Sequence, residues 1–171
     1  PNPDGELMFV KIKECKKVKR PIIIGSVYRS PSRQPGKFNE LLETVLQKID
    51  RNSNKHIVLL GDFNIDLIKH DRDINSQNVI DMTTNYGFVQ IISRPTRITD
   101  HSATLIDHIY TNKINKVISS SVVTHDLSDH LSTLVTISLD TNFDNVQWNN
   151  SSRQSDTNKH EYRIYNEANN E

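Results

Sequence analysis

A short apolar run that ends in a cluster of acids and amides constrains this chain more than any other segment. Residues 57–60 read Ile-Val-Leu-Leu, and the next four residues are Gly61, Asp62, Phe63 and Asn64. The apolar run favours a buried strand, whereas carboxylates and amides are costly to bury unless they find partners. Alternation along a strand end places Asp62 and Asn64 on one side, away from Phe63. The sequence therefore predicts a polar cleft at the end of a buried strand.

The segments around this strand alternate between β-type runs and helical periodicity. Two β-type runs at 7–13 and 20–28 favour a hairpin, and apolar residues at helical spacing within 38–49 predict an amphipathic helix. A second helix is expected with Ser76 as its N-cap and Gly87 at its end. Further short strands are expected at 88–92, 105–110, 117–124 and 131–139. This order predicts an α/β layered domain with a mixed sheet.

Composition narrows the function classes. The 21 basic and 21 acidic residues give a formal net charge of zero, so any contact with a polyanion must come from a local patch. The single cysteine, Cys15, excludes an internal disulfide and a cysteine-rich zinc site. No apolar run approaches the ~18 residues of a membrane span, so no membrane partner is expected. Polar residues dominate from about Asp140 onward, and we expect a domain over 1–139 followed by a polar linker over 140–171.

Two further polar groups lie at the ends of predicted strands. Asp107 lies in the run 105–110, where alternation places its side chain opposite those of Ile106 and His108. Residues 128–130 read Ser-Asp-His and stand at the start of the last predicted strand. Each group alone is an ordinary turn signal. Their position at the ends of several strands indicates one shared site.

The motifs VYRSPS, LLGDFNID, RPTR, LIDHIY and LSDHL occur in this order between residues 27 and 131. Their order resembles the endonuclease/exonuclease/phosphatase superfamily, which has the DNase I-like fold. In particular it resembles the apurinic-type endonuclease domain of non-LTR (LINE-like, jockey-like) retrotransposons. The resemblance spans roughly residues 7–139. It implies a four-layer α/β sandwich with a phosphodiester-cleaving site at one end of its two sheets.

The same resemblance implies that the chain lacks the N-terminal strands of that sandwich. In the family, an Asn and the Glu that is the principal metal ligand precede the region that VYRSPS occupies. Neither residue has a matching position in this sequence, and Glu6 does not match the metal-binding Glu. We therefore expect a fragment with weakened metal binding.

The resemblance also implies catalytic roles for five residues. Asp62 would orient and deprotonate the attacking water, and Asn64 would hydrogen-bond the water or the phosphate. His130 would donate to the phosphoryl oxygens, and Asp107 would hold its imidazole in the charged form. The hydroxyl of Tyr28, in the VYRSPS motif, would contact the phosphate.

Five further residues would bind the metal or the substrate. Asp129 matches a position that contacts Mg²⁺, or Mn²⁺, directly or through water. Ser128 would position a phosphate. Arg29 and Arg97 flank the motif loops and are the candidates for contacts with the DNA backbone. Thr96, within the RPTR motif, matches a family threonine near the DNA.

The expected function is divalent-metal-dependent DNA cleavage that nicks target DNA for retrotransposition. Its expected partners are DNA and a downstream reverse transcriptase of the same polyprotein, and its expected location is the nucleus. Two alternatives remain open. One is a catalytically dead retroelement remnant that at most binds DNA or protein. The other is a phosphomonoesterase or phospholipase, since one fold serves many phosphoester substrates; the RPTR motif and the retroelement-like tail favour DNA.

Overall fold

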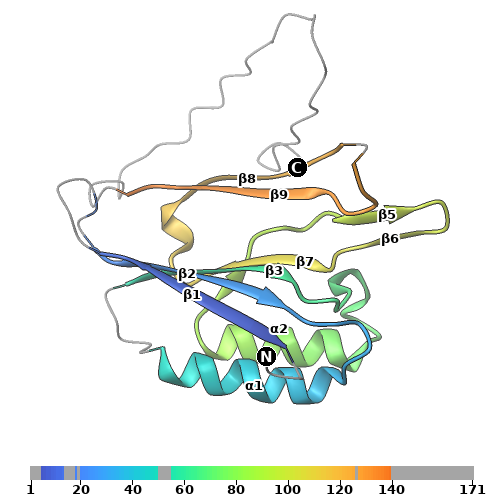
Figure 1. Cartoon of the computed structure of the whole chain (residues 1–171), viewed down its shortest axis with the longest axis horizontal. Helices are drawn as coiled ribbons and strands as arrows, with labels where there is room; N and C mark the ends of the chain where they lie inside the picture. The colour runs from blue at the N-terminus through green and yellow to red at the C-terminus, as the bar shows by residue number, and fades with distance from the viewer. Residues whose placement is uncertain (1–4, 14–17, 19, 50–54, 126, 140–171) are drawn as a thin grey trace, which may run out of the picture.

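The structure is a computed structural model of the 171-residue chain, and it describes residues 5–13, 18, 20–49, 55–125 and 127–139. Cys15 and the predicted linker 140–171 lie outside the described residues. The described residues form three layers (Figure 1): two helices, a central sheet above them, and a strand pair above the sheet. The predicted α/β architecture with a mixed sheet is therefore confirmed, and the described residues form three of the four expected layers.

The central sheet has five strands in the order β1-β2-β3-β7-β4. Their bounds are Glu6–Ile12 for β1, Ile22–Tyr28 for β2, His56–Asp62 for β3, Asp107–Thr111 for β7 and Val89–Gln90 for β4. Strands β1 and β2 pair antiparallel, as the predicted hairpin requires. Strands β2 and β3 run parallel, whereas β7 is antiparallel to both β3 and β4. The parallel pair directs the ends of β2 and β3 to the same edge of the sheet.

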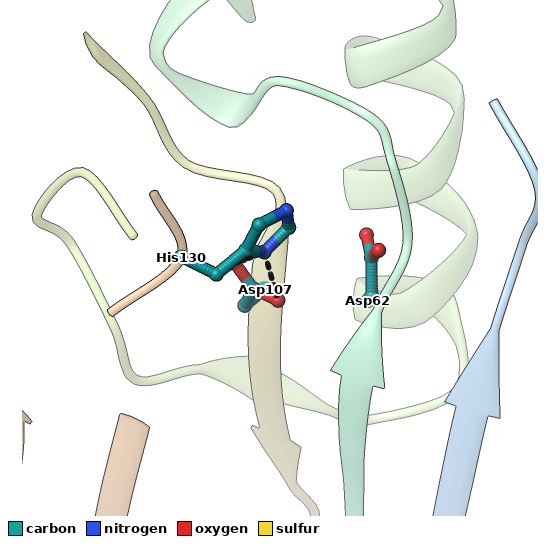
Figure 2. A group of neighbouring side chains, drawn as sticks. All are labelled: Asp62, Asp107 and His130. Atoms are coloured by element: carbon teal, nitrogen blue, oxygen red, sulfur yellow. Dashed lines mark hydrogen bonds and ion pairs between the residues drawn. The ribbon is translucent and has the colours of Figure 1, made fainter. Parts of the chain in front are cut away.

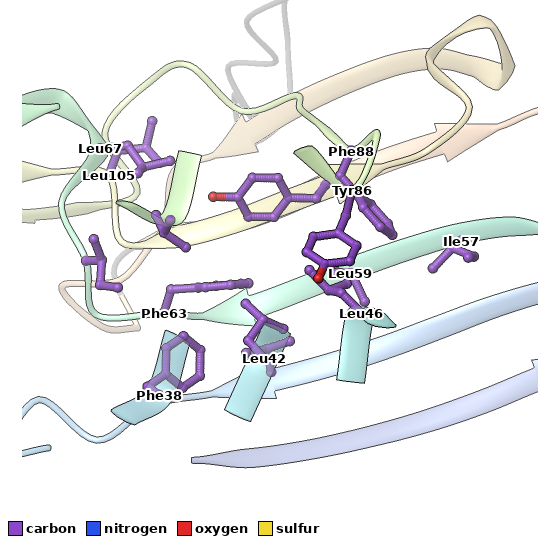
Figure 3. Packing of buried hydrophobic residues seen from close by; sticks show 14 residues of the cluster. Phe38, Leu42, Leu46, Ile57, Leu59, Phe63, Leu67, Tyr86, Phe88 and Leu105 are labelled. Carbon is purple, nitrogen blue, oxygen red and sulfur yellow. The ribbon is translucent and has the colours of Figure 1, made fainter. Parts of the chain in front are cut away.

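Helix α1 (Pro35–Lys48) connects the parallel strands β2 and β3. Proline at its first position suits a helix start, because the missing N–H would have no partner there. Phe38, Leu42 and Leu46 recur at helical spacing and are buried, as predicted. They pack with Leu59 and Phe63 in the main core cluster (Figure 3). This packing fixes the strand that carries Asp62 against a rigid helix layer.

Helix α2 (Ile74–Asn85) does not begin at the predicted cap. Its N-cap is Asp73, whose carboxylate accepts hydrogen bonds from the backbone amides of Asn75 and Ser76. Ser76 is instead a buried helical residue that donates to the backbone oxygen of Asp66. A carboxylate at this position also interacts favourably with the positive end of the helix dipole, which explains the preference for Asp73. Gly87, with φ of 73°, follows the end of the helix as predicted.

The second face of the central sheet is covered by β8 (Val117–Val123) and β9 (Ser132–Ile137), which pair antiparallel. Val122 of this pair packs against Val58 and Ile109 of the sheet in a second core cluster. A small hairpin of β5 (Arg97–Thr99) and β6 (Ser102–Thr104) extends beyond β7 (Figure 1). Two 3-10 turns, Leu67–Lys69 and Ile114–Lys116, complete the regular elements. In the part of the chain described here, neither helix is long and apolar enough to cross a membrane.

Candidate active site

Two carboxylates face each other across neighbouring strands at one edge of the sheet. Asp62 is the last residue of β3 and Asp107 is the first residue of β7, and the strand register pairs them directly. Residues directly opposite each other in an antiparallel pair present their side chains on the same face. Burial raises the pKa of Asp62, and the nearby charge of Asp107 raises it further. A proton or a cation beside this pair would relieve both effects.

An imidazole completes the group. The Nδ1 nitrogen of His130 lies 3.1 Å from Oδ2 of Asp107 (Figure 2). Because a carboxylate at neutral pH can only accept, Nδ1 carries the proton and Nε2 is the ring nitrogen left for another partner. Ligand atoms of Asp62, Asp107 and His130 all lie within 4.8 Å of one another, and these three residues form the catalytic group. The structure thus brings together three of the predicted catalytic residues from three separate motifs.

Tyr28 lies in the same cross-strand row as the two acids. It ends β2 and is in register with Asp62 of β3, and its side chain is half-exposed. The row continues to Glu6 of β1, which is in register with Tyr28 at the sheet edge. The sequence did not predict this position of Glu6, although the register of the predicted hairpin could have indicated it.

Asn64 follows the strand end in a left-handed backbone conformation, with φ of 49°. Its backbone amide donates to Oδ1 of Asp62 at 2.9 Å, and its side-chain amide donates to the backbone oxygen of Arg29 at 2.8 Å. Strand alternation therefore does not determine where this side chain points. Asparagine tolerates such a conformation better than most residues do. Its placement shapes the loop directly after Asp62.

Arg29 was predicted to bind substrate, but its side chain is buried, with 3% of its surface exposed. Its guanidinium donates to the backbone oxygens of Phe63 at 2.7 Å and Arg33 at 2.6 Å, and also to that of Asn64. Burial lowers the pKa of Arg29, whereas the negative charge of Asp62 raises it. In this structure Arg29 therefore stabilises the loop after β3 through its hydrogen bonds to Phe63 and Asn64.

Thr96 was also predicted to contact substrate, and it is fully buried. Its Oγ1 accepts hydrogen bonds from the backbone amides of Ile106 at 3.2 Å and Asp107 at 2.9 Å. Its backbone oxygen accepts from the amide of Leu131 at 2.6 Å. The threonine therefore touches the segments that carry Asp107 and His130.

Arg97, Asp129 and Ser128 flank His130 on the exposed side. Nε of Arg97 donates to Oδ2 of Asp129 at 2.7 Å, and this hydrogen bond lowers the pKa of Asp129. Oγ of Ser128 accepts from the backbone amide of His130 at 3.0 Å. Asp129 lies outside the group formed by Asp62, Asp107 and His130, so its role as a metal ligand stays a prediction.

His108, the neighbour of Asp107, belongs to the core and not to the site. It is fully buried and stacks on Phe63 with ring centroids 4.5 Å apart. Its Nε2 lies 2.9 Å from the backbone oxygen of Ile65, and burial lowers its pKa to about 4. This placement agrees with the alternation that favoured Asp107 over His108 as the site residue.

The donor set of the catalytic group fits a divalent cation. Mg²⁺ is usually held by one or two carboxylates together with water and substrate phosphate. Asp62 and Asp107 supply two carboxylates, which suit Mg²⁺ and Mn²⁺ alike.

Residues 22–134 match the family described as endonuclease-reverse transcriptase. The chain belongs to this family. Among solved structures, the endonuclease domain of TRAS1, a telomere-specific non-LTR retrotransposon, is similar with a TM-score of 0.61 at 17% identity. That match covers 77% of this chain and 63% of the TRAS1 domain. No curated protein matches the chain.

Two bacterial proteins show the same fold as this endonuclease-reverse transcriptase family member. An endonuclease/exonuclease/phosphatase family protein from Leptotrichia buccalis has a TM-score of 0.55 at 19% identity, over 77% of this chain and 53% of that one. The mannosyl-6-phosphatase Bt3783 from Bacteroides thetaiotaomicron has a TM-score of 0.54 at 14% identity, over 77% and 56%. These likenesses confirm the DNase I-like fold that the motif order implied, and the chain spans less than two thirds of each.

Proposed function

We propose that this chain is part of a divalent-metal-dependent endonuclease that nicks target DNA for retrotransposition. The observation that carries the proposal is the contact between His130 and Asp107 beside Asp62 at one edge of the sheet. Membership of the endonuclease-reverse transcriptase family supports phosphodiester hydrolysis as the reaction. The likeness to the TRAS1 domain supports DNA as the substrate.

Asp62 acts as the general base. A carboxylate whose pKa is raised by burial accepts a proton more readily than an exposed one. The attacking water gives its proton to Asp62, and its oxygen forms the new bond to phosphorus. The bond between phosphorus and the leaving sugar oxygen breaks in the same displacement.

His130 stabilises the negative charge that builds on the phosphoryl oxygens. Its Nε2 donates to one of these oxygens when the imidazole is protonated. The carboxylate of Asp107 accepts a hydrogen bond from Nδ1–H of His130 and so fixes the required ring orientation. The two residues act as one unit.

The carboxylates of Asp62 and Asp107 would hold the cation, which, when bound, would neutralise charge on the phosphoryl group as a Lewis acid. Asp129 stays a proposed additional metal contact. Tyr28 and Ser128 would contact the phosphate, since both lie at the same end of the sheet.

The exposed Arg97 is the candidate for the DNA backbone. Asn64 would hydrogen-bond the water or the phosphate through its amide oxygen. DNA and a reverse transcriptase of the same polyprotein would be the partners, and the nucleus the place of action.

A phosphomonoesterase is the second candidate, because the matched mannosyl-6-phosphatase has the same fold. The test compares two substrates at equal enzyme concentration in Mg²⁺ and in Mn²⁺: supercoiled plasmid and mannose 6-phosphate. Conversion of plasmid to the open circle without phosphate release supports the endonuclease. Phosphate release without nicking supports the phosphatase. The absence of both reactions supports the inactive remnant.

A further inference from the structure

We propose that Thr96 is a positioning residue that sets the contact between Asp107 and His130. This inference rests on the proposed function, because it assigns a residue to the same hydrolytic site. The side chain of Thr96 is fully buried. It lies between the two segments that supply the acid and the imidazole.

The side chain of Thr96 binds the acid's segment. Its Oγ1 accepts from the amide of Asp107 at 2.9 Å and from the amide of Ile106 at 3.2 Å. The backbone amide of Thr96 also donates to the oxygen of Thr104 at 2.8 Å. Since a hydroxyl oxygen has two lone pairs, both acceptor positions are used at the point where β7 begins.

Backbone hydrogen bonds connect Thr96 and its neighbours to the segment that carries His130. The oxygen of Thr96 accepts from the amide of Leu131 at 2.6 Å, and the amide of Ile98 donates to the oxygen of Asp129 at 2.9 Å. Arg97 and His130 form an isolated antiparallel bridge between these two bonds. His130 is therefore flanked on both sides by hydrogen bonds to the segment of Thr96.

These contacts make Thr96 a hydrogen-bonded link between the segments that carry Asp107 and His130. The hydroxyl holds the backbone of Asp107 from one side, and the peptide oxygen of the same residue holds the residue after His130 from the other. A shift of Thr96 would change the distance between His130 Nδ1 and the Asp107 carboxylate, now 3.1 Å. Because Thr96 is fully buried, it acts through these residues and not by touching DNA.

Two substitutions of Thr96 separate the role of its hydroxyl from the role of its shape. Thr96→Val keeps the shape but removes the acceptor for two amides, whereas Thr96→Ser keeps the hydroxyl. Thr44→Val is the matched control, since the hydroxyl of Thr44 donates within α1 to Glu40, on the exposed helix surface. Plasmid nicking in Mg²⁺ is measured for each purified variant of residues 1–171. A second readout, independent of activity, is the NMR signal of the His130 Nδ1 proton.

For Thr96→Val we expect kcat to fall about 10- to 100-fold with KM within about twofold, because small misplacements of catalytic groups have effects of this size. The His130 Nδ1 proton signal is expected to shift or broaden. Thr96→Ser is expected to restore both readouts to near wild type, and Thr44→Val to change neither. Wild-type kcat together with an unchanged His130 signal in Thr96→Val would overturn the inference.

Misfolding of Thr96→Val and inactivity of the wild-type chain can each be distinguished from a failure of the inference. If Thr96→Val does not fold, Thr96→Cys replaces it, because a thiol is a weaker acceptor of similar size. An unchanged His130 signal in folded Thr96→Cys then overturns the inference. If the wild-type chain does not nick plasmid, the proposed function fails, and the NMR comparison alone decides whether Thr96 positions the pair.

Discussion

The Nδ1 nitrogen of His130 lies 3.1 Å from the Asp107 carboxylate, although the two residues are 23 positions apart. The contact joins the start of β7 to the residues that precede β9. It leaves Nε2 of His130 on the side of the ring away from Asp107. The pair can therefore direct a proton donor towards a bound phosphate beside Asp62.

Replacing Asp107 with asparagine tests this relationship. Asp107→Asn removes the carboxylate that accepts the hydrogen bond from Nδ1 of His130, while keeping the size of the side chain. We expect the plasmid-nicking rate to fall about 10²-fold or more, as is typical when acid–base assistance is lost. Asp81→Asn, on the exposed side of α2, is the control. Equal rates for Asp107→Asn and wild type would show that the contact has no part in catalysis.

Asp62→Asn is expected to separate activity from stability. Burial and the charge of Asp107 raise the pKa of Asp62 in the fold above its reference value of 3.8. The charged carboxylate therefore destabilises the folded state above its folded pKa, and this cost disappears as pH falls towards 3.8. Asp62→Asn should have an equal or higher Tm at pH 7, with nicking reduced about 10²-fold or more. Thermal melts at pH 7 and pH 4 check this, and a clearly lower Tm at pH 7 would contradict it.

Arg29→Met is expected to destabilise the fold. The variant leaves the backbone oxygens of Phe63 and Arg33 without the guanidinium that they bond in the wild type. Each buried polar group left unsatisfied costs about 1–3 kcal/mol, so we expect a loss of about 2–5 kcal/mol in the free energy of unfolding. Urea unfolding measures the loss. Arg33→Met changes an exposed side chain and should stay within about 0.5 kcal/mol of wild type. A similar small effect for Arg29→Met would show that the hydrogen bonds of Arg29 are dispensable.

The free energy of unfolding is expected to depend on pH because two histidines, His56 and His108, are buried. Burial lowers the pKa of His108 to about 4, and burial with the charges of Lys113 and Lys116 lowers that of His56 to about 4. Between pH 4 and 6.5 the unfolded chain binds more protons, so the free energy of unfolding falls as pH falls. For the fully buried His108 this shift corresponds to about 3 kcal/mol across that window.

Urea titrations at several pH values between 7 and 4 test this expectation. His56→Gln keeps a side chain that can bond Thr111, whose hydroxyl lies 2.8 Å from Nε2 of His56. The variant cannot take up a proton, so its stability should fall less steeply than that of wild type. Identical slopes for the two proteins would show that His56 titrates normally in the fold.

The sequence predicted the elements whose pattern is local. The apolar run before Asp62 forms a buried strand, and the spacing of Phe38, Leu42 and Leu46 forms the buried face of α1. Strand alternation separated Asp107 from the core residue His108. These inferences succeeded because side-chain direction follows from the period of the element.

Other features depend on contacts between distant loops, which no local pattern encodes. Arg29 was predicted to contact DNA because it flanks a motif, and Thr96 because it matches a family threonine. Both side chains are buried and hydrogen-bonded to backbone groups of other segments. The direction of Asn64 follows from a left-handed turn and not from strand alternation. Asp73, and not Ser76, is the N-cap of α2, because the carboxylate of Asp73 accepts hydrogen bonds from the first backbone amides of the helix.

The measurement that tests the central claim most directly is plasmid nicking by His130→Ala. His70→Ala is the matched control, because His70 is exposed and lies beside the turn before α2, outside the catalytic group. We predict that His130→Ala nicks supercoiled plasmid in Mg²⁺ about 10²-fold or more slowly than wild type, while His70→Ala stays within about twofold. Nicking by His130→Ala at the wild-type rate would contradict the assignment of Asp62, Asp107 and His130 to one hydrolytic site.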